Sequence, residues 1–141
     1  MRRFIKRWLQ DQRGDMAETA LVMPVVTLML MLMITIPMTS WTATSANTIA
    51  QRAARAASVA QDPGLRVAVA VQTGEELAQQ FTYGKYTLEV LNAGAAPGDV
   101  VVVRVRWEAL NWAAAAASLF PGLFNDTLRG EAVAAYRVEG W

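Results

Sequence analysis

The 141-residue sequence contains no cysteine and no histidine. Without cysteine there are no disulfide bonds and no thiol chemistry, and without histidine there are no imidazole bases and few ways to build a zinc site. The sequence also lacks a Gly-Lys-Ser/Thr phosphate loop and an acidic metal-binding loop. Since most residues of common active sites are missing, we expect neither an enzyme nor a bound cofactor or metal.

Charged side chains are scarce, at 18% of the residues, whereas hydrophobic residues make up 54%. A net charge of +1, with no basic stripe outside the first few positions, argues against a nucleic-acid binder. The excess of apolar residues indicates that part of the surface faces something other than water. The chain has room for one small domain and an appendage.

Ionisable side chains are absent from 33 consecutive positions, Thr19 to Gln51. The first part of this gap is rich in leucine, methionine, valine and isoleucine, and about 20 such residues in a helix span the ~30 Å hydrocarbon core of a bilayer. We therefore predict a transmembrane helix over residues 19–41. Pro24 and Pro37 lie near its ends, where a helix accommodates proline most easily.

The membrane orientation follows from the basic residues before the apolar run, which are Arg2, Arg3, Lys6, Arg7 and Arg13. Basic residues beside a membrane segment stay in the cytoplasm. We therefore predict a cytoplasmic basic leader over residues 1–18, a single pass of the membrane, and an extracytoplasmic C-terminal part. The alternative is a secretory signal cleaved near Ala46, although the apolar run exceeds the ~7–15 residues of a signal core.

Alanine is abundant beyond the apolar run, and this predicts an extracytoplasmic extension of the helix over residues 42–61. Small residues recur there at three- and four-residue spacing: Ala46, Ala50, Ala53, Ala57 and Ala60. Such a narrow face lets another element approach closely. It packs either onto the protein's own domain or onto another subunit.

Residues 62–141 are predicted to form a small α+β domain with a three-stranded antiparallel sheet and additional helices. Asp62 and Pro63 are typical of a helix start, and we expect this helix to end near Phe81. Alternating valines leave residues 64–73 open between helix and strand. Alternating apolar residues then predict strands over 83–91, 100–108 and 128–140, the first two forming a hairpin.

Two features of the sheet region have consequences for contacts. The hairpin would bring Glu89 near Arg104 or Arg106. The connection over residues 110–127 is rich in alanine and large apolar side chains, among them Trp112, Leu119, Phe120, Leu123 and Phe124. We expect this connection to be helical, and it either covers the sheet or contacts a partner or the lipid surface.

The stretch "RGDMAETALVMP", residues 13–24, sets Glu18 directly against the apolar run. An ionisable group at that place either caps a helix N-terminus or has a partner. Together with "AQRAARAA" and "GDVVVVRVRWEAL…FPGLF…LRGEAVAAYRVE", this stretch resembles the TadE-like proteins of Tad (tight adherence) pilus systems. These are minor pilins or pseudopilins of bacteria, and the resemblance covers nearly the whole chain.

The resemblance implies a pilin-like fold and a function in assembly of a Tad-type pilus or secretion apparatus, through helix packing and subunit contacts. It implies cleavage by a prepilin peptidase between Gly14 and Asp15, which would make Glu18 the fourth residue where the family usually has the acidic residue fifth. Glu18 and Pro24 would act in subunit assembly. The implied partners are other pilin or TadE-like subunits and the assembly platform.

A second hypothesis is a single-span membrane protein whose extracytoplasmic domain binds a ligand or another protein. It differs from the first in that the function would lie in the outer domain and not in the membrane helix.

Overall fold

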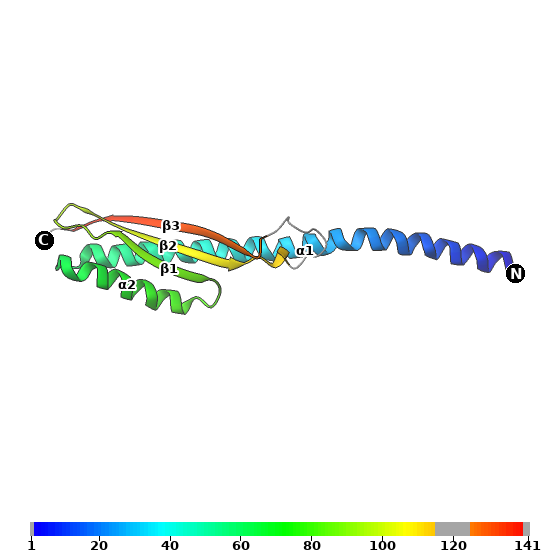
Figure 1. The fold of residues 1–141 in the computed structure, drawn as a ribbon, viewed down its shortest axis with the longest axis horizontal. Coiled ribbons are helices and arrows are strands. Elements are labelled where there is room, and N and C mark those ends of the chain that lie inside the picture. Colours follow the sequence, from blue (N-terminus) through cyan, green and yellow to red (C-terminus); the bar gives the residue numbers. More distant parts are fainter. Residues whose placement is uncertain (1, 115–124, 140–141) are drawn as a thin grey trace. The chain divides into compact units, whose positions relative to one another are not determined.

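The computed structural model describes the backbone of residues 2–114 and 125–139, and the side chains from Met16 onward in that range, apart from Ala17. In this part of the chain the elements are α1 (Arg2–Val59), α2 (Pro63–Gln80), β1 (Lys85–Asn92), β2 (Val100–Leu110) and β3 (Thr127–Arg137) (Figure 1). The predicted α+β class, the long apolar N-terminal helix and the three-stranded antiparallel sheet are confirmed.

The chain divides into two compact units. The first unit comprises Met1–Thr35 and Asn111–Asn125, and the second comprises Ile36–Leu110 and Asp126–Trp141. Helix α1 begins in the first unit and ends in the second, so the predicted continuation of the helix beyond residue 41 is confirmed. The second unit holds the sheet, α2 and the last part of α1, and we call it the globular unit.

In the sheet, β2 lies between β1 and β3 and pairs antiparallel with both. Side chains alternate between the two faces of a strand. Val101, Val103 and Val105 are fully buried on the inner face, as the alternating pattern predicted. Burying a valine stabilises a fold by roughly 1.5–3 kcal/mol relative to leaving it exposed, so this triplet is a main contributor to the core.

The inner face of the sheet packs on the alanine face of α1. Ala46, Ala50, Ala53 and Ala57 have no exposed surface, and they belong to the same core cluster as the valines of β2. Side chains this small let the helix lie close to the sheet, while Ile49 fills the larger space beside them. Of the two alternatives for this face, packing onto the protein's own domain is therefore confirmed.

Helix α2 begins as predicted. The carboxylate of Asp62 accepts a hydrogen bond of 2.8 Å from the Gly64 amide, and Pro63 occupies the first turn. Residues 64–73 are helical, which settles the alternative left open by the valines. Gly74 lies so close to Leu88 of β1 that a Cβ atom there would overlap the leucine side chain, so α2 packs tightly on the strand.

The connection between β2 and β3 is described only at its two ends. Residues 112–114 form one turn of 3₁₀ helix. The rest of the predicted helical connection, including Leu119, Phe120, Leu123 and Phe124, lies outside the described residues. The connection belongs to the first unit and not to the globular unit that contains the sheet.

Candidate functional site

The most unusual surface of the described chain is the apolar part of α1. From Glu18 onward α1 is long and apolar enough to cross a membrane, with a mean hydropathy of 2.4 in its most apolar 18-residue window and only 6% of that window buried. Its large side chains point away from the protein, for example Leu21 at 77% exposure and Met33 at 72%. Leaving so many apolar side chains in water is unfavourable, so this surface requires an apolar environment or a partner.

Several hydroxyl groups of this helix donate hydrogen bonds within the helix itself. Thr35 donates a hydrogen bond of 2.8 Å to the Met31 carbonyl, four residues earlier, and Thr42 donates one of 2.9 Å to the Met38 carbonyl. An unsatisfied polar group is costly where water is absent, and this local bonding removes the cost. The sequence-based prediction did not consider these threonines, although their spacing in a helix allows the contact.

The predicted site residues Gly14, Asp15, Glu18 and Pro24 all lie on α1. Gly14 and Glu18 are four residues apart, so they share one face of the helix. The side chain of Glu18 is exposed, and it forms no ion pair with any side chain that the structure describes. The helix continues through Pro24 without interruption.

The helix begins at Arg2, so Glu18 lies far inside it. In α1 as the structure describes it, Glu18 therefore does not cap the N-terminus, because the helix dipole acts within the first turn. The described side chain of Glu18 thus lies exposed at the start of the apolar part of α1.

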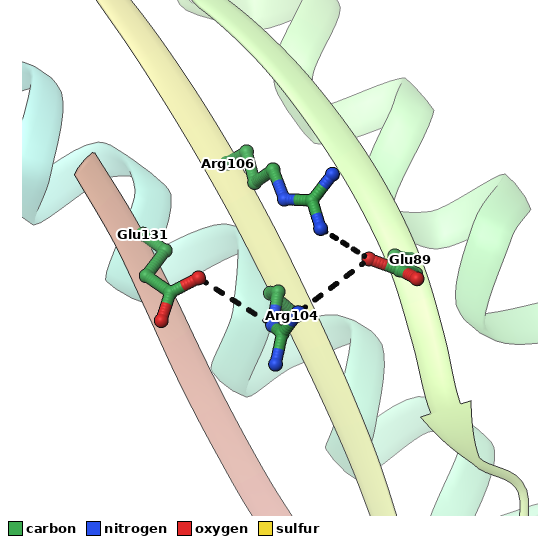
Figure 2. A network of polar contacts seen from close by, with 4 residues as sticks. All are labelled: Glu89, Arg104, Arg106 and Glu131. Atoms are coloured by element: carbon green, nitrogen blue, oxygen red, sulfur yellow. Dashed lines mark ion pairs between the residues drawn. The ribbon is translucent and has the colours of Figure 1, made fainter. Parts of the chain in front are cut away.

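The outer face of the sheet carries ion pairs that link all three strands (Figure 2). The Glu89 carboxylate on β1 lies 3.2 Å from Nη2 of Arg106 and 3.9 Å from Nη1 of Arg104, both on β2. Both predicted pairings of Glu89 are thus confirmed. Nε of Arg104 lies 3.5 Å from the Glu131 carboxylate on β3, an ionic contact without hydrogen-bond geometry. These side chains are 29–60% exposed, so each pair contributes at most about 1 kcal/mol.

A cleft of about 270 Å³ lies at the end of the sheet where β1 begins and β2 ends. The residues that line it include Thr82, Tyr83, Lys85, Glu108 and Thr127. The Glu108 carboxylate is paired with Nη2 of Arg129 at 3.3 Å, and the Tyr83 hydroxyl donates a hydrogen bond of 3.2 Å to the Leu110 carbonyl. Among the residues that the structure describes, no group of three acidic side chains is placed to hold a metal ion.

The globular unit contains one buried cation, Arg66 of α2, with 4% of its surface exposed. Its Nε donates a hydrogen bond of 3.0 Å to the Ala60 carbonyl, and its Nη1 donates one of 2.6 Å to the Gly94 carbonyl. Arg66 therefore joins the turn between the helices to the turn between β1 and β2. This role of Arg66 could not be predicted from the sequence, because Gly94 is 28 residues away.

Two groups in the globular unit have shifted pKa values. Burial raises the pKa of the Tyr86 phenol, whose hydroxyl donates a hydrogen bond of 2.9 Å to the Tyr83 carbonyl. Hydrogen bonds from the amides of Ala96 and Ala95 lower the pKa of the exposed Asp99 carboxyl. The Tyr86 shift follows from the packing of its ring and the Asp99 shift from the amides of its own turn, so we assign both groups to the fold.

Comparisons of the chain with protein-family models, with curated proteins and with solved structures give no match. Any functional conclusion must therefore be drawn from the residues and their arrangement.

Proposed function

We propose that this protein is a membrane-anchored subunit that acts by contact and not by catalysis, in the manner of the TadE-like minor pilins and pseudopilins that its sequence resembles. The observation that carries the proposal is the exposed apolar surface of α1 with a single carboxylate, Glu18, at its start. The same helix ends in a packed α+β unit, which suits a subunit with one part in the membrane and one part outside it.

In the proposed arrangement, residues 19–41 cross the bacterial inner membrane with the basic N-terminus in the cytoplasm. The apolar side chains of α1 pack laterally on the helices of other pilin or TadE-like subunits. Glu18 neutralises a neighbouring subunit's terminal amine or another basic group, because a carboxylate at the edge of the hydrocarbon needs such a partner. The result is assembly of a Tad-type pilus or secretion apparatus.

Paired labelling at the helix surface tests this proposal. The chain has no native cysteine, so Met29→Cys and Met33→Cys, at exposed apolar positions of α1, each introduce a unique attachment point for a benzophenone maleimide. We expect illumination of intact membranes to cross-link the benzophenone at each of these two positions to another subunit. The captured subunits should carry an acidic residue at the start of their own apolar helix. The matched control is Leu65→Cys, at an exposed apolar position of α2. Lipid adducts alone from both positions would contradict the proposal.

Processing of the leader is a separate prediction. Cleavage between Gly14 and Asp15 by a prepilin peptidase would remove 14 residues and place Glu18 in the first helical turn, where the helix dipole favours a carboxylate. We expect the chain mass to fall by these 14 residues when the peptidase is present, and to remain unchanged in a Gly14→Leu variant. A full-length mass for the unaltered chain with active peptidase would refute cleavage at this bond.

The second hypothesis, a ligand-binding outer domain, has one observation in its favour. The cleft is lined by Lys85 and by Glu108, whose carboxylate lies 3.3 Å from Nη2 of Arg129, so a small polar molecule would meet charged side chains there. If this hypothesis holds, Lys85→Ala abolishes the protein's function while the photo-cross-links from α1 are lipid adducts only.

A further inference from the structure

A buried hydrogen bond attaches the connection between β2 and β3 to α1. The Ala113 amide donates to Oγ1 of Thr35 at 3.2 Å, across 78 positions of sequence. Thr35 is 5% exposed and Ala113 only 1%, so this hydrogen bond is shielded from solvent. The start of the connection is therefore held against the apolar part of the helix.

The point of attachment lies within the predicted membrane span. Thr35 follows Glu18 by 17 positions, and 17 residues of α-helix rise ~25 Å, less than the ~30 Å of a hydrocarbon core. The neighbouring side chains of Met33 and Ile34 remain 72% and 50% exposed. If residues 19–41 span a membrane, the turn attached at Thr35 lies at the depth of these two side chains.

The composition of the turn is compatible with a lipid environment, because it carries no charge. No residue from Leu110 to Asn125 carries a charge, and the indole of Trp112 is 46% exposed. The Ala114 amide donates to the Asn111 carbonyl at 3.0 Å, and the Asn111 side-chain amide donates to the Asn125 carbonyl at 2.8 Å. These polar groups are thus bonded within the connection, as backbone in a bilayer must be.

From these three observations we propose that the turn Trp112–Ala114, after β2, is a second membrane-contacting element that lies in the lipid beside α1. Its partner is the lipid surface. The protein then holds the bilayer at two places, through the spanning helix and through this turn, and the turn limits how far the helix can slide along the membrane normal. The inference rests on the proposed span of residues 19–41.

The test uses three single-cysteine variants of the full chain, each labelled with the polarity-sensitive fluorophore nitrobenzoxadiazole. The positions are all exposed: Trp112→Cys in the turn, Met33→Cys on α1 and Leu65→Cys on α2. Each protein is reconstituted in vesicles of phosphatidylcholine and phosphatidylglycerol with a nitroxide on the acyl chain. We expect the fluorescence loss at position 112 to equal that at position 33, while position 65 shows none.

The outcomes separate the two proposals. If the fluorophore at position 33 is quenched and the one at position 112 is not, as at position 65, the lipid contact of the turn is overturned and the membrane span is left intact. If the fluorophore at position 33 is not quenched, as at position 65, the membrane span is overturned, and the inference with it. Because each variant changes one exposed residue, a shared loss of folding is not expected, and circular dichroism of each labelled chain verifies this.

Discussion

Replacing Glu18 by alanine is expected to weaken the association of α1 with its partner helices by roughly tenfold to a hundredfold. A hydrogen bond to a charged group contributes about 1.5–3 kcal/mol, and about 1.4 kcal/mol corresponds to a factor of ten in affinity. The measurement is the fraction of the Met33→Cys chain that is cross-linked to other subunits in intact membranes. Glu18 is exposed on the helix, so its loss leaves the fold itself unchanged.

Two further variants show whether the charge of Glu18 is responsible. Glu18→Gln keeps the shape of the side chain but removes the charge, and we expect it to weaken association nearly as much as alanine. Glu75→Ala removes an exposed carboxylate from α2, and it should leave the cross-linked fraction unchanged. Normal cross-linking by Glu18→Ala would refute the proposed role of this carboxylate.

Replacing Arg66 by methionine is expected to lower the free energy of unfolding of the globular unit by about 3 kcal/mol. The substitution removes the two hydrogen bonds that the guanidinium donates, and the Ala60 and Gly94 carbonyls lose this donor. Hydrogen bonds from a charged group contribute roughly 1.5–3 kcal/mol each. A methionine fills much of the same space, so packing loss adds little. Urea unfolding of the full chain in detergent, followed by tryptophan fluorescence, measures the change.

The matched control is Arg55→Met, the same substitution at an exposed position near the end of α1. A surface substitution of this kind changes stability by no more than about 0.5 kcal/mol. Equal unfolding midpoints for the Arg66→Met and Arg55→Met chains would show that the buried arginine does not hold the two turns together.

Most of the secondary structure could be predicted because the apolar residues repeat with the period of a strand or a helix. In β2, Val101, Val103 and Val105 recur at every second position, and all three are buried in the sheet. The first half of α2 was ambiguous between helix and strand because its valines also alternate. The buried face of this helix is formed instead by Arg66, Ala70, Gly74 and Leu77, and Val67 is 44% exposed. The misleading residues therefore lie outside the core.

Contacts between distant parts of the chain were mostly beyond sequence reasoning. Glu89 could be assigned to the arginines of β2 because a hairpin fixes which residues face each other. Glu131 could not be added, since the register of β3 depends on a long connection. The bond between Ala113 and Thr35 joins an alanine amide and a threonine hydroxyl, and neither residue type reveals such a partner.

The claim that residues 19–41 lie in a membrane while the following part of α1 lies outside it has a direct test. Thr27 and Asn47 are both exposed on α1, so a cysteine at either position is equally open to reagent in the bare protein. We predict that a membrane-impermeant maleimide labels Asn47→Cys in cells whose outer membrane has been permeabilised, and labels Thr27→Cys only after denaturation in dodecyl sulfate. Equal labelling of the two positions before denaturation would contradict the account.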